Sequence, residues 1–129
     1  MRAEELKGHL DAVLLAALEG GPRHGYAVIE ALRQSTDGRL DLPTGTIYPA
    51  LRRLEQAGLI AGTWSVVGGR RRREYRLTPA GIRALSGRRA AWRDFSATVT
   101  AALESATLVN AALENAALED TACPSPNPA

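Results

Sequence analysis

Cysteine and long apolar runs are almost absent from this chain of 129 residues. Cys123 is the single cysteine, so one chain can form neither an internal disulfide nor a cysteine-based metal cluster. No run of about 18 apolar residues exists, and no apolar stretch follows a basic start. The sequence therefore predicts neither secretion nor a membrane span, and a reducing cytoplasm is the expected location.

Groups that could support catalysis are equally scarce. The two histidines, His9 and His24, have no cysteine near them in the sequence, so no metal site is expected. No pairing of nucleophile and base, no carboxylate pair and no phosphate-cradling loop is present. We therefore expect a protein that is not an enzyme and carries no cofactor. His24 is expected to begin a helix, either bonding to backbone or packing on Tyr26.

Basic residues are unevenly distributed along the chain. All 16 Lys and Arg lie within residues 1–99, with 10 of the 14 Asp and Glu, so this part has a net charge of +6. Residues 100–129 hold four acidic residues and no basic ones, a net charge of −4. A basic body with an acidic tail suits a polyanionic partner for the body.

Residues 42–77 are the most informative stretch, and they begin with a helix. Its apolar residues recur at a helical period and predict one buried side: Ile47, Ala50, Leu51, Leu54 and Ala57. Thr46 is favoured over Thr44 as the N-cap, since Pro49 would then stand in the first turn. Gly58 is expected to end the helix. The residues left facing outward are Gly45, Tyr48, Pro49, Arg52 and Gln56.

A basic hairpin follows this helix directly. Residues 63–67 and 74–77 are predicted strands joined through Gly68-Gly69, with four arginines, Arg70–Arg73, at and just after the turn. These arginines have two interpretations: a solvated charge run that protects an edge strand, or contacts to phosphates. Their position after a helix with a cationic outer face favours the phosphate contacts. Trp64 is expected to pack.

The other predicted helices complete a recognisable order of secondary-structure elements. Two helices precede residue 42, and Thr78-Pro79 predicts the start of a long fourth helix. The fold class is therefore mainly α with a small β-hairpin: a winged helix-turn-helix plus a long C-terminal helix. We expect the DNA-binding domain at 1–80 and the dimerisation helix at 81–108. Residues 109–129 form an acidic, Ala-rich tail that is expected to be partly disordered, above all from Thr121.

The fourth helix carries an apolar seam. Leu85, Trp92 and Val99 are spaced seven apart, and Phe95 takes the fourth place of the same heptads, although Arg88 interrupts the pattern. A seam of this kind predicts a second copy as partner, whereas the alternative is packing on its own domain. Trp92 and Phe95 would either form plain core or line a cavity for a small aromatic effector. The predicted dimerisation residues are Leu10, Leu14, Leu85, Trp92, Phe95, Val99 and Leu103.

Taken together, these motifs resemble the PadR-like transcriptional regulators. The resemblance covers roughly residues 6–103 and is carried by HGY from His24, GTIYPALRRLE from Gly45, YRLTPAG from Tyr75 and the helix containing Trp92. It implies a homodimeric, usually repressing, transcription factor of the short type that binds an inverted repeat in double-stranded DNA. It also implies that the third helix enters the major groove and that the wing contacts the backbone or minor groove.

The predicted DNA-binding set combines this resemblance with position along the helix and wing. Its members are Tyr26, Thr44, Thr46, Tyr48, Pro49, Arg52, Gly69, Arg70, Arg71 and Arg72. Tyr48 is either a phosphate contact or a half-buried aromatic, and Arg53 is expected to pair with Glu55 or Glu30 instead of DNA. The alternative function is a winged helix that binds an acidic protein through its arginines.

Overall fold

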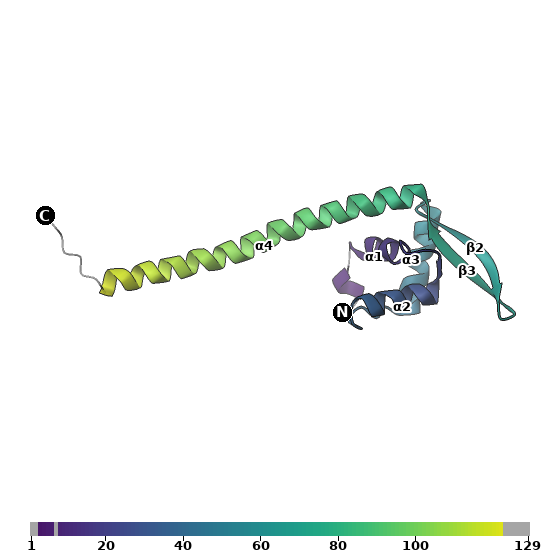
Figure 1. The fold of residues 1–129 in the computed structure, drawn as a ribbon, viewed down its shortest axis with the longest axis horizontal. Coiled ribbons are helices and arrows are strands. Elements are labelled where there is room, and N and C mark those ends of the chain that lie inside the picture. Colours follow the sequence, from purple (N-terminus) through teal and green to yellow (C-terminus); the bar gives the residue numbers. More distant parts are fainter. Residues whose placement is uncertain (1–2, 7, 123–129) are drawn as a thin grey trace. The chain divides into compact units, whose positions relative to one another are not determined.

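The computed structural model describes residues 3–6 and 8–122, with side chains for residues 4–6, 8–105 and 110–116. Cys123 and the rest of the predicted disordered end lie outside the described residues. Contacts divide the chain into two compact units with a boundary between Arg89 and Ala90. The elements, labelled in Figure 1, are η1 (Ala3–Leu6), α1 (Leu10–Ala17), β1 (Arg23–His24), α2 (Gly25–Ser35), α3 (Thr44–Gln56), β2 (Ile60–Val67), β3 (Arg70–Leu77) and α4 (Pro79–Ala122).

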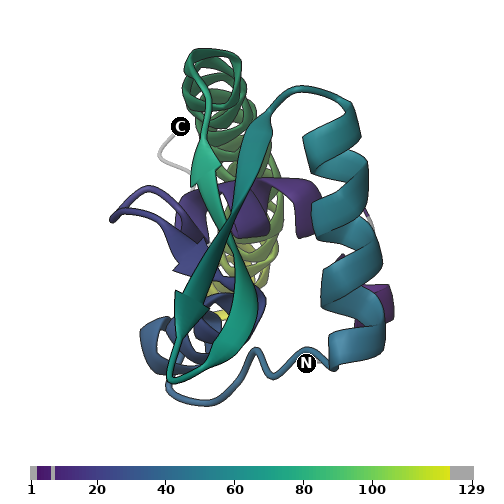
Figure 2. The same ribbon diagram turned by 90° about the vertical axis from the view of Figure 1, so that its right-hand side faces the viewer.

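The hairpin is confirmed and is longer than predicted. Strands β2 and β3 pair antiparallel from Ile60 opposite Leu77 to Val67 opposite Arg70. The connection is therefore Gly68-Gly69, whose φ angles of 59° and 77° are the left-handed values that a two-residue turn of this kind requires. All four arginines lie within β3 instead of at the turn, and Figure 2 shows how strongly the two strands twist.

A third strand was not predicted. The two-residue strand β1 pairs with β3, Arg23 opposite Tyr75 and His24 opposite Glu74, which gives a sheet with the order β1-β3-β2. This strand ends where α2 begins, so it ties the start of α2 to the hairpin.

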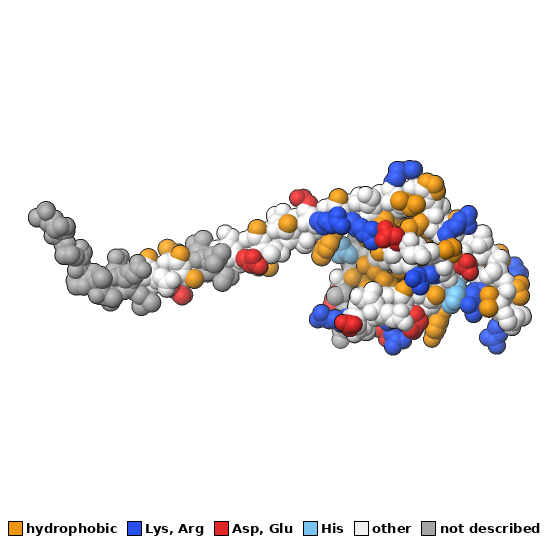
Figure 3. Space-filling model, viewed as in Figure 1, with side chains coloured by type: hydrophobic (Ala, Val, Ile, Leu, Met, Phe, Trp, Pro, Cys, Tyr) orange, Lys and Arg blue, Asp and Glu red, His pale blue; other side chains and the backbone are white. Residues whose placement is uncertain are grey.

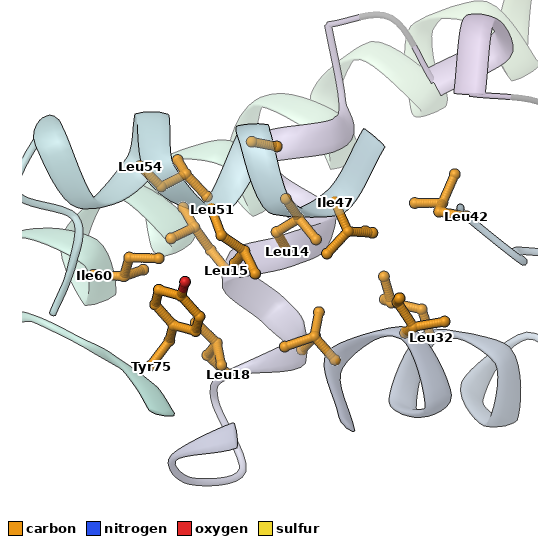
Figure 4. Packing of buried hydrophobic residues seen from close by; sticks show 14 of the residues in the cluster. Leu14, Leu15, Leu18, Leu32, Leu42, Ile47, Leu51, Leu54, Ile60 and Tyr75 are labelled. Atoms are coloured by element: carbon orange, nitrogen blue, oxygen red, sulfur yellow. The ribbon is translucent and has the colours of Figure 1, made fainter. Parts of the chain in front are cut away.

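One apolar core joins α1, α2, α3 and the sheet. The predicted inner side of α3 is confirmed for Ile47, Ala50, Leu51 and Leu54, which are at most 1% exposed. It was wrong for Ala57, which follows the last turn of the helix and is exposed. Figure 4 shows the Tyr75 ring from β3 beside Leu18 and Ile60. Because burying a leucine-sized side chain contributes about 1.5–3 kcal/mol, this cluster accounts for most of what holds the unit together.

Helix α3 begins earlier than the sequence indicated. It starts at Thr44 with Pro43 as the N-cap residue, so the preference for Thr46 as the cap was wrong. Pro49 therefore lies in the second turn, where its missing N–H leaves the Gly45 carbonyl without the usual helical donor. The predicted end is confirmed: Gly58 has a φ of 77°, and the Leu59 N–H donates to the Leu54 carbonyl at 3.1 Å.

Helix α4 begins as predicted, because the Thr78 hydroxyl accepts the Gly81 N–H at 3.1 Å. Its first turns pack on the N-terminal unit, where Leu85 is 3% exposed, and Leu14 of α1 is fully buried in the same core. This corrects their assignment to a contact between chains, since neither side chain has surface left for one. Arg88, which interrupts the heptads, donates to the Gly8 carbonyl at 3.1 Å.

The same helix continues through the Ala-rich repeats to Ala122, so Thr121 and Ala122 are helical, while the rest of the end predicted to be disordered lies outside the described residues. None of the helices in the described part of the chain combines the length and apolar character needed to cross a membrane.

Candidate nucleic-acid interface

The outer side of α3 is polar and exposed, as the apolar period predicted. Ile47, Ala50, Leu51 and Leu54 turn inward, which leaves the other side of the helix to solvent. All five residues that the sequence assigned to DNA on this helix are at least partly exposed: Thr44, Tyr48, Pro49 and Arg52 are exposed and Thr46 is partly so. Gly45 and Gln56 are exposed beside them.

Tyr48 is a half-buried aromatic, which is one of its two interpretations, and its contact with phosphate stays a prediction. Its side chain is 44% exposed, yet one side of the ring packs on Gly25 at the start of α2. A Cβ at Gly25 would lie 2.5 Å from Tyr48 Cε1, so only glycine lets the ring approach α2 this closely. Tyr26, the next residue, is 60% exposed. The start of α2 thus adds Tyr26 to Tyr48 of α3 on the same surface.

The wing presents arginines on both of its faces. Tyr75 is buried, so the face of β3 that carries Arg71, Arg73 and Tyr75 is the one turned toward the core. Arg71 lies near the tip of this face, where it is exposed and has its Cζ 4.6 Å from the centroid of the Trp64 ring. Arg70 and Arg72 are exposed on the opposite face. The sequence expected Trp64 to pack, but its side chain is 58% exposed, and the guanidinium groups of Arg71 and Arg73 lie over its ring.

A groove of about 700 Å³ lies between α3 and the wing. Its lining residues are His24, Gly25, Tyr26, Tyr48, Arg52, Glu55, Trp64, Arg71, Arg72, Arg73 and Tyr75. Burial raises the pKa of Tyr75 above its ordinary value, so its hydroxyl stays protonated at neutral pH. Three tyrosines, a tryptophan and four arginines therefore line this groove, and one of the four, Arg72, belongs to the opposite face of β3. Figure 3 shows arginine side chains, in blue, around the wing end of the unit.

Two residues on α3 pair in ways that the sequence did not indicate. Arg53 pairs with Asp11 of α1, so its predicted pairing with Glu55 or Glu30 was wrong. Glu55 is instead bound by Arg73 of the wing. Arg53 is therefore held away from the groove, while Arg52 remains on its lining.

His24 caps α2, as predicted for a residue that begins a helix. Its Nδ1 accepts the Ala27 N–H at 3.3 Å. Desolvation by burial and the nearby Arg72 lower the pKa of His24, and Glu74 opposes them. The folded protein therefore favours neutral imidazole, which is the form that can accept this hydrogen bond.

This arrangement predicts a stability that declines in mild acid. Because the pKa of His24 is lower in the folded state, its contribution is complete above the ordinary value of 6.5 and is lost as the pH falls through the folded pKa. His24→Asn keeps an acceptor at the N-cap without titrating. Between about pH 7 and pH 5 the thermal midpoint should fall further for the unaltered protein than for His24→Asn. Equal falls in the two proteins would contradict the assignment.

Among the described residues, no group of three or more His, Cys, Asp or Glu is placed to hold a metal ion. Arg23, in the short strand beside His24, donates from Nε to the Ala17 carbonyl at 2.9 Å. Glu55, Arg73 and Gly25 line the groove and Gly62 packs against Arg73, although the sequence analysis did not assign any of the four to the DNA-binding set. A glycine inside a strand, as at Gly62, is the one signal that could have indicated a close approach.

Comparisons with known proteins agree with this geometry. Residues 14–87 match the family model described as the transcriptional regulator PadR-like family. A transcriptional regulator of Mycobacterium tuberculosis is 42% identical over 77 residues, which is 60% of this chain and 59% of that protein. The match therefore spans less than two thirds of that relative's own length.

Solved structures extend the similarity to most of the chain. A transcriptional regulator from Clostridium thermocellum superposes with a TM-score of 0.70 at 28% identity, over 76% of this chain and 96% of the other. A PadR family transcriptional regulator from Eggerthella lenta gives a TM-score of 0.68 at 34% identity, over 78% and 87%.

Proposed function

Because the chain belongs to the PadR-like family of transcriptional regulators, we propose that it binds double-stranded DNA as a homodimer and represses transcription from an inverted-repeat operator. The family consists of transcriptional regulators and not of enzymes. A dimer that occupies promoter DNA would block access of the polymerase, which is the simplest route to repression.

The observation that carries the proposal is the joint exposure of the outer side of α3 and the arginines of the wing. A helix fits the major groove, and Arg52 on its exposed side has the fork geometry that binds guanine or phosphate. Arg70 and Arg72 project from the wing, where guanidinium groups can neutralise backbone phosphates. A polar helix beside a cationic hairpin therefore supplies both sequence reading and charge.

A second copy of the chain is the proposed partner of α4. In the unit that begins at Ala90, the side chains of Trp92, Phe95 and Val99 are 52%, 58% and 39% exposed. The rings of Trp92 and Phe95 lie side by side with their centroids 6.0 Å apart. Leaving such a row in water is costly, and its heptad spacing suits a helix of the same kind. Leu103 and the partly buried Leu10 of α1 complete the proposed contact.

The same aromatic pair supports a ligand-gated version of the function. A planar aromatic effector stacked on Trp92 and Phe95 would favour a dimer with altered spacing of the two recognition helices. Titration of such a compound should then quench tryptophan fluorescence and release DNA together. Quenching without release would leave the rings as plain dimer core.

Salt dependence tests the proposed function. The logarithm of the affinity for a mixed-sequence duplex should fall linearly with the logarithm of salt, with a slope of about −0.9 for each phosphate neutralised. Arg70→Ala should make that slope shallower by about one contact in each chain. Arg33→Ala is the matched control, because it removes the same charge from a side chain already paired with Glu30 and Asp41.

A weak dependence on salt would contradict DNA binding. It would instead favour the alternative function, in which the winged helix binds an acidic protein.

A further inference from the structure

Among the described residues of the wing, Arg73 is the arginine whose guanidinium is bound by α3, the proposed recognition helix. Its Nε donates to Glu55 Oε1 at 3.4 Å and its Nη2 donates to Glu55 Oε2, so the contact has two hydrogen bonds. Both side chains are 28% exposed. The hydrogen bond to Glu55 raises the pKa of Arg73 above its ordinary value. The contact joins the middle of β3 to the last turn of α3.

The wing is shaped to hold this guanidinium in place. Trp64, opposite Arg73 in the register, has its ring centroid 5.2 Å from Arg73 Cζ. Gly62, two residues earlier on the same face of β2, leaves room for the same group. A Cβ at Gly62 would lie 2.6 Å from Arg73 Nε and 2.8 Å from Cζ. The Arg73 side chain therefore crosses β2 over a glycine, with an aromatic ring beside it, to reach α3.

We propose that Glu55, Arg73 and Gly62 position the wing relative to the recognition helix, so that both can engage DNA at the same time. The inference rests on the proposed DNA binding and adds a role for residues that need not contact DNA. Glu55 is the most telling of the three, because a carboxylate on a DNA-facing groove repels phosphate. Its presence is explained if it fixes a neighbour that binds DNA.

For Glu55→Gln, the proposal predicts a change in DNA affinity opposite to the one that electrostatics alone would give. Glu55→Gln removes a negative charge from the groove, so electrostatics alone would tighten DNA binding and steepen the salt dependence. Positioning predicts the opposite: affinity falls on the order of tenfold, the scale of one lost direct contact, and the slope becomes shallower as the wing disengages. Glu74→Gln is the matched control, since it removes the same charge from the other face of β3 and should not weaken binding.

Gly62→Ala provides a test without any change of charge. The three atoms nearest to the added methyl group all belong to the movable end of the Arg73 side chain, so the substitution should displace the guanidinium and leave the strand intact. Its affinity should fall about as far as that of Glu55→Gln. Since both substitutions break one contact, the double variant should be no weaker than either single variant. Thermal midpoints and dimer mass are measured for each variant, and affinities are compared well below the lowest midpoint.

The outcomes separate the inference from the function on which it rests. If the unaltered protein shows no salt-dependent DNA binding, the proposed function fails. If it binds DNA but Glu55→Gln binds as tightly or more tightly, or Gly62→Ala has no effect, positioning by Arg73 is overturned. Additive losses in the double variant would also overturn it, because the two residues would then act separately.

Discussion

Replacing Gly81 by alanine should lower the free energy of unfolding of the N-terminal unit by about 3 kcal/mol, at the upper end of the usual cost of overpacking. Gly81 lies in the first turn of α4, where a Cβ would come within 1.9 Å of the Leu59 carbonyl oxygen. That oxygen accepts the Thr78 N–H at 3.1 Å. The Leu59 carbonyl belongs to the backbone and cannot rotate away as a side chain could. The start of α4 would therefore have to move away from the start of β2.

Thermal unfolding of Gly81→Ala, compared with that of Gly87→Ala on the same helix, measures this effect. For a unit of this size, a loss of 1 kcal/mol lowers the midpoint by roughly 4–8 °C. Gly87→Ala is the matched control, since the same helix has nothing within 4 Å of a Cβ at that position. It should stabilise by up to about 1 kcal/mol through helix propensity. If the thermal midpoints of the two variants change equally, the short distance to the Leu59 carbonyl oxygen does not explain why glycine is needed at position 81.

Trp92→Ala combined with Val99→Asp should convert the protein to monomers. The first change removes the largest apolar side chain of the proposed seam, and the second places a charge in it. Losing the second copy should also weaken operator binding by about a hundredfold, because two linked sites gain at least that much from acting together. Sedimentation equilibrium gives the mass directly.

A neighbouring position controls for the added charge. Thr100→Asp introduces the same acid one residue further on, roughly 100° round the helix and away from the seam. This variant should remain a dimer. If the double variant keeps the mass of the unaltered protein, the seam on α4 is not the contact between chains.

Regular periodicity is what made much of the fold predictable. The inner side of α3, its end at Gly58, the Gly68-Gly69 turn and the start of α4 at Thr78 each depend on residues near one another in sequence. Strand β1 could not be predicted, because two residues have no period. It exists only through pairing with β3, some fifty residues away.

In the candidate site, too, only the features that depend on local sequence could be predicted. The exposure of Tyr48 and Arg52 followed from the helical period, but the partners of the other charged residues depend on tertiary packing. Arg53 reaches Asp11, 42 residues earlier, and Arg73 reaches Glu55, 18 residues earlier. A heptad count also cannot distinguish a contact within the chain from one between chains, which is why Leu85 was assigned to the wrong surface.

Selection of binding sites from a pool of random duplexes is the most direct test of the central claim, that two joined copies present paired recognition helices to DNA. The selected sequences should contain an inverted repeat whose half-sites are centred about one helical turn, or a small multiple of it, apart. Enrichment of a lone half-site, or no enrichment at all, would contradict the account.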